Sequence, residues 1–144
     1  MATGDRKDPL RVFHFLVEID GIARAGFREC SGLDSTQDVI EYREGNEGPS
    51  SRKLPGMVHN TNITLKRGLT DDLQLWEWRE KAARGKAERK NGSIIMLDET
   101  GAEKLRWNFI NAWPTKWTGP TLNAAGNELA IESLEIAHEG LTKA

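Results

Sequence analysis

The sequence contains few of the residues and patterns on which disulfide scaffolds, zinc sites and membrane spans depend. Cys30 is the only cysteine among 144 residues, so no disulfide can form within the chain. His14, His59 and His138 are far apart, and no cysteine or histidine has zinc-ligand spacing. No stretch approaches the roughly 18 consecutive apolar residues that predict a membrane helix. We therefore expect no metal site and no insertion into a membrane.

Sequence signatures of enzymes are also missing. The chain has no P-loop, no Gly-x-Gly-x-x-Gly fingerprint and no Gly-x-Ser-x-Gly nucleophile elbow. Cys30 would need a general base and an electropositive pocket to act as a nucleophile, and its sequence neighbourhood offers only Arg28. A structural cysteine is the better interpretation. We expect no catalytic residues, no cofactor and no enzymatic activity.

The chain has no large excess of charge of either sign. It carries 20 Lys and Arg against 22 Asp and Glu, a formal net charge of −2. Nucleic-acid-binding domains usually have a basic excess or a basic stripe. The most basic stretch, residues 79–90, is diluted by Glu80 and Glu88. Its cations are better explained as the solvated end of a helix, where positive charge is favoured. The polar start of the chain lacks the apolar core of a signal peptide, so we expect synthesis in the cytoplasm.

Alternation of apolar and polar residues predicts β-strands over most of the sequence. The pattern is clear over residues 11–19, 39–43, 61–67 and 104–109. In the last strand, residues 128–138, the apolar phase changes between Ile131 and Leu134. A β-bulge near Glu132 and Ser133 would allow the apolar side to switch.

A single helix is predicted over residues 71–84. Asp71 and Asp72 stand where negative charge is favoured, and Gly85 suits the position just beyond the end. Together with roughly seven or eight strands joined by short turns, this pattern predicts a mainly β fold. We expect an antiparallel β-sandwich or barrel with one flanking α-helix, in a single domain over residues 1–144.

Two segments lack periodicity. Residues 1–8 are polar, and we expect them to be flexible. Residues 44–56 are rich in glycine, proline, serine and charge, and predict a long connection. A connection of this length inside a compact domain is usually functional or disordered. Of the tryptophans, Trp76, Trp78 and Trp107 fit core positions, whereas Trp113 and Trp117 are candidates for a subunit contact, where aromatic residues are enriched.

An ordered series of motifs resembles the tail tube proteins of contractile phage tails and of phage tail-like contractile injection systems. No single motif is decisive, but the series runs in the same order over nearly the whole chain. It comprises residues 8–10, residues 13–21 (Phe-His-Phe-Leu-Val-Glu-Ile-Asp-Gly), residues 25–33, residues 41–46 (Glu-Tyr-Arg-Glu-Gly-Asn), residues 52–56 (Arg-Lys-Leu-Pro-Gly), residues 63–68, residues 75–78, residues 113–117 (Trp-Pro-Thr-Lys-Trp) and residues 128–132.

The resemblance implies a fold similar to type VI secretion ring proteins and a structural role. Six subunits would form a ring, and rings would stack into a hollow inner tube that delivers DNA or an effector protein. Residues 44–56 resemble the extended loop with which such proteins reach neighbouring subunits. The residues expected to make these inter-subunit contacts are Arg43, Glu44, Gly45, Asn46, Glu47, Arg52, Lys53, Leu54 and Pro55.

The same resemblance implies several partners. They are a surrounding sheath protein, a baseplate or spike, a tape-measure or terminator protein, and a cargo in the lumen, all within a phage tail or injection particle. Two alternatives remain open at this point. A type VI-like secreted ring protein would assemble mainly as free rings, and a ligand-binding β-barrel would stay monomeric and close its own sheet edges.

Overall fold

The computed structural model describes residues 14–43, 45, 48–126 and 129–144, which contain ten strands and one helix. The strands are β1 (His14–Ile19), β2 (Ile22–Gly26), β3 (Glu29–Ser31), β4 (Ser35–Tyr42), β5 (Arg52–Asn60), β6 (Ile63–Gly68), β7 (Lys90–Leu97), β8 (Glu103–Thr118), β9 (Ile131–Ala137) and β10 (Gly140–Lys143). The helix is α1 (Gln74–Ala83). A mainly β fold with one flanking helix is therefore confirmed.

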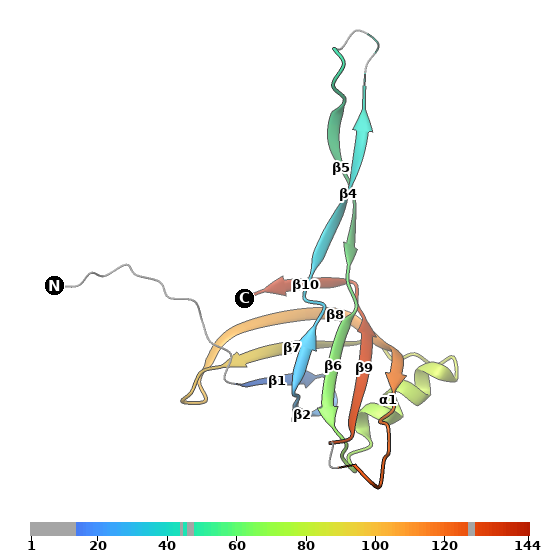
Figure 1. Cartoon of the computed structure of the whole chain (residues 1–144). Coiled ribbons are helices and arrows are strands. Elements are labelled where there is room, and N and C mark those ends of the chain that lie inside the picture. Colours follow the sequence, from blue (N-terminus) through green and yellow to red (C-terminus); the bar gives the residue numbers. More distant parts are fainter. Residues whose placement is uncertain (1–13, 44, 46–47, 127–128) are drawn as a thin grey trace, which may run out of the picture.

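Strand β8 belongs to two antiparallel sheets and bends between them (Figure 1). Its first half pairs with β7 and β10, which extends the first sheet in the order β2-β1-β7-β8-β10. Its second half pairs with β9, which gives the second sheet the order β8-β9-β6-β3. At Asn111 the backbone has a left-handed φ of 52°, and its N–H donates to Oδ1 of Asn91 at 3.0 Å. This residue marks the change of partner.

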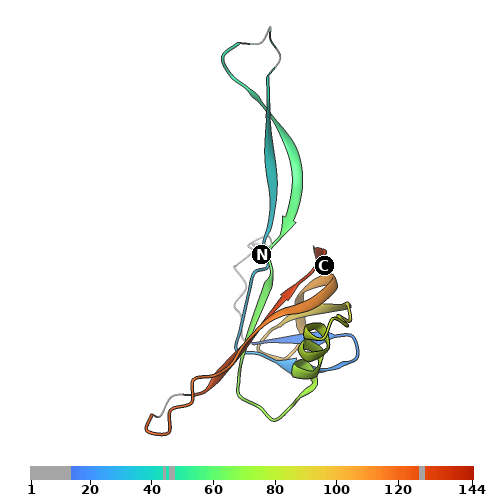
Figure 2. The same ribbon diagram turned by 90° about the vertical axis from the view of Figure 1, so that its right-hand side faces the viewer.

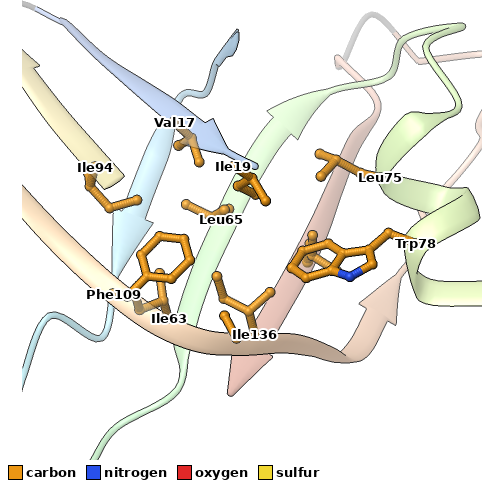
Figure 3. Close-up of a cluster of buried hydrophobic side chains, with 11 residues drawn as sticks. Val17, Ile19, Ile63, Leu65, Leu75, Trp78, Ile94, Phe109 and Ile136 are labelled. Atoms are coloured by element: carbon orange, nitrogen blue, oxygen red, sulfur yellow. The ribbon is translucent and has the colours of Figure 1, made fainter. Parts of the chain in front are cut away.

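The core lies between the two sheets and is closed on one side by α1 (Figure 3). The first sheet contributes Val17 and Phe109, the second contributes Leu65 and Ile136, and the helix contributes Trp78. The indole N–H of Trp78 donates to the carbonyl oxygen of Glu88 at 2.7 Å, so its polar atom is satisfied despite burial.

The helix is shorter than the sequence predicts. It begins at Gln74 rather than at residue 71, and ends at Ala83. Asp71 and Asp72 precede it, and Oδ1 of Asp72 accepts the backbone N–H of Gln74 at 3.0 Å. Asp72 therefore serves the turn that leads into the helix. Gly85 follows the helix with φ of +80°, as the sequence predicts.

The bulge predicted near Glu132 and Ser133 is wrong. Strand β9 pairs with β6 without interruption, from Gly68 opposite Ile131 to Ile63 opposite Ile136. The apolar phase changes because Glu132 itself occupies an inward position of the strand. The irregularity in this sheet lies in β8, between Pro114 and Lys116.

A buried ion pair explains how the core accepts Glu132. Nε of Arg67 donates to Oε1 of Glu132 at 2.8 Å, and both side chains are 8% exposed. The guanidinium of Arg67 also lies 5.7 Å from the centre of the Phe27 ring, and its Nη2 donates to the carbonyl oxygen of Asp72 at 3.4 Å. The pair thus connects β6, β9 and the turn before α1.

The connection predicted over residues 44–56 is mostly part of a long hairpin. Residues 52–56 lie in β5, which pairs with β4 from Tyr42 opposite Arg52 to Ser35 opposite Asn60. Sequence reasoning missed this strand because Pro55 and Gly56 interrupt its alternation. The hairpin extends well beyond the sandwich (Figure 2).

Removing one charge of the buried pair should destabilise the protein strongly. We expect Arg67→Met or Glu132→Leu alone to cost roughly 3–5 kcal/mol, because the remaining charge is left buried without a partner. The double variant should recover most of this loss, since two apolar side chains of similar volume then replace the pair. Urea unfolding of the unassembled protein measures these differences. Single variants as stable as the parent would contradict the structure.

Candidate functional site and assembly surfaces

The hairpin formed by β4 and β5 exposes both of its faces. Every residue of β4 is exposed, and the two strands form a sheet of their own. The exposed apolar residues of the hairpin are Val39, Ile40, Tyr42, Leu54, Met57 and Val58. An isolated two-stranded hairpin is marginally stable in water. A hairpin that carries apolar side chains without a core of its own therefore indicates a surface that another chain covers.

Cross-strand pairs show that apolar and charged groups occur on each face. Ile40 lies opposite Leu54, and two residues further along Tyr42 lies opposite Arg52 on the same face. The other face carries Glu41 opposite Lys53, next to Val39 opposite Pro55. Neither face is the polar, solvent-facing side of an ordinary antiparallel sheet. Each face can thus bury an apolar pair and form an ion pair with a partner.

The root of the hairpin is held by polar contacts at a register shift. The shift lies between Gln37 and Val39, and places Asp38 at the irregularity. Oδ2 of Asp38 lies 2.9 Å from Nε2 of His59, and Nε2 of Gln37 donates to the carbonyl oxygen of Gly56 at 3.0 Å. These contacts connect the two strands where the hairpin leaves the sandwich.

The structure places the predicted inter-subunit residues in different segments. Arg52, Lys53, Leu54 and Pro55 lie in β5 on the hairpin and are exposed. Arg43 follows β4 and is exposed, as is Gly45. Glu44, Asn46, Glu47 and the segment 1–8 lie outside the described residues. Sequence reasoning did not assign the apolar residues of β4 or those at the end of β5 to this surface. For β4, the alternation over residues 39–42 was the available signal.

A second group of exposed apolar residues lies at the opposite end of the molecule. The segment before α1 and the connection from β8 to β9 lie at the end away from the hairpin in both views (Figures 1 and 2). These segments carry Leu69, Leu73, Leu122 and Leu129, of which Leu122 and Leu129 are 76% and 75% exposed. We call these four leucines the basal patch. Exposed apolar residues at one end of a molecule can form an interaction surface.

The outer face of the second sheet is polar. Thr64 and Lys66 alternate along β6 with the buried Ile63, Leu65 and Arg67, so they point away from the core. The cross-strand neighbours on this face are Glu29, Ser31, Ser133 and Glu135. Nζ of Lys66 lies 3.7 Å from Oε2 of Glu29, and Nδ2 of Asn62 donates to Oε1 of Glu135 at 2.9 Å. This face can stay hydrated and carries charges of both signs.

Three described strands of the two sandwich sheets leave backbone edges open, in addition to the two strands of the hairpin. Strands β2 and β3 end the path of hydrogen-bonded strands, and β10 pairs only with β8. Open edges offer unpaired N–H and C=O groups to another chain.

Chemical groups typical of catalysis or metal binding do not gather in the described residues. Burial raises the pKa of the Cys30 thiol to about 12, so the thiolate required of a nucleophile does not form near neutral pH. No group of three or more His, Cys, Asp or Glu there could hold a metal ion. No helix in this part of the chain is long and apolar enough to cross a membrane.

The tryptophans divide differently from the prediction. Trp78 is buried, as expected, but Trp76 is 43% exposed and Trp107 only partly buried. The ring of Trp76 meets that of Trp117 edge to face, with centroids 5.3 Å apart. Helical spacing explains why the prediction for Trp76 was wrong, because Trp76 lies off the stripe formed by Leu75 and Trp78.

Known structures share this fold. A chain of the extracellular contractile injection system PVC sheath–tube complex in the extended state is 30% identical, with a TM-score of 0.84, over 94% of this chain and 91% of the other. A chain in the cap of the anti-feeding prophage, which terminates its tube, is 30% identical with a TM-score of 0.85, over 100% and 99%. Hcp1 from Flavobacterium johnsoniae shares the fold at 16% identity and a TM-score of 0.62, over 91% and 94%.

The family comparison agrees with these structures. No curated protein sequence matches the chain. The family profile described as T4-like virus tail tube protein gp19 matches residues 11–142. The exposed hairpin, the basal patch and the open strand edges are features of a subunit that assembles, and the motif series along the sequence resembles the same proteins. The chain belongs to the T4-like virus tail tube protein family.

Proposed function

We propose that this chain is the structural subunit of the inner tube of a contractile injection system. Six copies form a ring, rings stack into a hollow tube, and the lumen passes a cargo. The observation that carries this proposal is the hairpin of β4 and β5, whose two faces are both exposed and partly apolar. Family membership over residues 11–142 supports the role of a tube subunit.

Open strand edges support ring closure. Strands β2, β3 and β10 each have one unpaired edge among the described residues. Backbone hydrogen bonds between such edges of neighbouring subunits would join the sheets around the ring and remove the exposed edges.

Opposite ends of the subunit support stacking. The hairpin lies at one end and the basal patch at the other, and both carry exposed apolar side chains. A contact between two different surfaces of identical subunits propagates without closing when it runs along an axis. The hairpin of one ring would contact the basal patch of the next, so that each ring presents the same surfaces to its neighbours. Residues 43–47 and 52–55 belong to this contact.

The polar face of the second sheet supports a hydrated lumen. Its pairs of opposite charge, such as Lys66 with Glu29, give it little net charge. Dense positive charge would retain DNA through many phosphate contacts. The cargo is an effector protein or DNA, and the outer partners are a sheath protein, a baseplate or spike, and a tape-measure or terminator protein. Subunits are synthesised in the bacterial cytoplasm before assembly.

Negative-stain electron microscopy of the purified protein over a range of concentrations tests the proposal. We expect six-fold rings at low concentration and hollow tubes at high concentration. Free rings at every concentration would favour a type VI-like ring protein. A monomer at every concentration, also in the presence of the baseplate protein, would contradict a tube subunit.

Shortening the hairpin should abolish tubes without unfolding the subunit. We expect replacement of residues 40–54 by Asn-Gly to leave the thermal midpoint within a few degrees of the parent, because no buried core residue is removed. The variant should form no tubes in electron micrographs. Ile40→Leu with Leu54→Ile, which keeps this pair apolar, serves as the control and should assemble. An unfolded deletion variant, or one that still forms tubes, would disprove this role of the hairpin.

Charges in the basal patch should separate ring formation from stacking. We expect Leu122→Asp with Leu129→Asp to form rings but not tubes, because stacking would bury unpaired carboxylates. The matched variant Leu122→Met with Leu129→Met keeps the patch apolar and should stack as the parent does. Sedimentation and micrographs at equal protein concentration distinguish the two states. Tubes from the aspartate variant would show that stacking uses another surface.

A further inference from the structure

The hairpin is fixed to the second sheet where its two strands begin and end. A Cβ atom placed on Gly32, just before β4, would lie 2.0 Å from the carbonyl oxygen of Asn62, just after β5, so glycine is required for this close approach. Nδ2 of Asn62 donates to Oε1 of Glu135 in β9 at 2.9 Å. Nε2 of His138 lies 3.1 Å from the carbonyl oxygen of Thr61. The hairpin therefore starts from a defined position on the sandwich.

Further out, the hairpin stands apart from the sandwich. We call residues 35–37 with 58–60 the base, and residues 39–42 with 52–55 the arm. The strands β4 and β5 form a sheet of their own, and every residue of β4 is exposed. The arm extends away from the two larger sheets (Figure 2). Its direction is consequently determined by the backbone that joins it to the base.

A β-bulge separates the arm from the base. Asp38 of β4 stands opposite two residues of β5, Gly56 and Met57. The regular pairs on either side of this bulge are Gln37 with Val58 and Val39 with Pro55. One extra residue adds about 3.3 Å of backbone to a strand that lies about 4.8 Å from its partner. A straight ladder cannot absorb this difference, so the bulged strand bends and its twist increases.

Several contacts hold the bulge in one conformation. Nε2 of Gln37 donates to the carbonyl oxygen of Gly56 at 3.0 Å. Oδ2 of Asp38 lies 2.9 Å from Nε2 of His59. A Cβ atom on Gly56 would lie 3.1 Å from both the carbonyl oxygen of Asp38 and Cγ1 of Ile40, so β5 approaches β4 closely at this point. The bend is thus part of the single subunit and does not need a partner.

We propose that this bulge sets the rotation between successive rings of the tube. It directs the arm to one position around the ring, where the arm contacts a basal patch of the next ring. Because the same contact repeats in every ring, a fixed direction of the arm gives a fixed rotation from ring to ring. This inference rests on the proposed function, which places the hairpin of one ring against the basal patch of the next.

Deletion of Gly56 tests this role of the bulge. It leaves Met57 alone opposite Asp38, keeps the other cross-strand pairs on their present faces, and removes no side chain. Deletion of Ser50, which lies between β4 and β5, shortens the chain equally but keeps the bulge, and serves as the control. We expect tubes without Gly56 to differ from the parent in ring-to-ring rotation by more than replicate parent tubes differ. Tubes without Ser50 should have the parent's rotation, measured by helical reconstruction from cryo-electron micrographs.

Distances within the unassembled subunit test the direction of the arm without tubes. Nitroxide labels at Lys53→Cys on the arm, paired with Lys86→Cys or with Lys104→Cys on the sandwich, report two such distances in a Cys30→Ser background. The three lysines are exposed. We expect deletion of the bulge glycine to shift at least one distance, and the control deletion to leave both at the parent's values. Pulsed electron paramagnetic resonance measures them.

Each contrary outcome has a distinct meaning. If the parent forms no tubes, the proposed function fails and this inference fails with it. If the parent forms tubes but deletion of Gly56 leaves the rotation or both label distances unchanged, only the role of the bulge is overturned. Shifted distances together with rings that no longer stack would support the bulge, provided that the Ser50 deletion variant still stacks, because the arm would then miss the basal patch.

Discussion

Strand β8 has to satisfy backbone hydrogen bonds in two sheets that do not lie in one plane. It pairs with β7 and β10 along one half and with β9 along the other, and the left-handed backbone of Asn111 accompanies the change. Because the strand bends, the two sheets face each other and leave one open side for α1. The position of the core, the orientation of the polar face and the place of the helix all depend on this bend.

The core and the hairpin differ in whether they need a partner chain to bury their apolar side chains. The core is complete without any partner, since it is closed by both sheets and the helix. The hairpin contributes none of the buried core residues, so its apolar side chains contribute to stability only when another chain covers them. In the proposed tube, the folding unit and the assembly unit would be separate parts of one short chain. Changes to the hairpin would then alter assembly without altering the core.

Much of the fold could be predicted from local pattern. Alternation predicted the strands, and Gly85 predicted the end of the helix. Prediction from local pattern failed where contacts between residues remote in sequence determine the structure. The change of apolar phase at Glu132 was interpreted as a bulge, because its ion-pair partner Arg67 is remote in sequence. Residues 52–55 of the candidate site were predicted, but the strand that contains them was not. The strand is regular because it pairs with β4, and this pairing leaves no local signal in the sequence. The contact between the rings of Trp76 and Trp117 joins α1 to β8, and no local signal in the sequence could have predicted it.

Because the hairpin and the basal patch lie at opposite ends, the two ends of the subunit are chemically different. Any stack in which one contacts the other has two chemically unlike termini, one with free hairpins and the other with uncovered leucines. Growth by addition of subunits would then proceed at unequal rates at the two termini. A factor that starts the stack and a factor that stops it must recognise different surfaces, so they cannot be interchangeable copies of one protein.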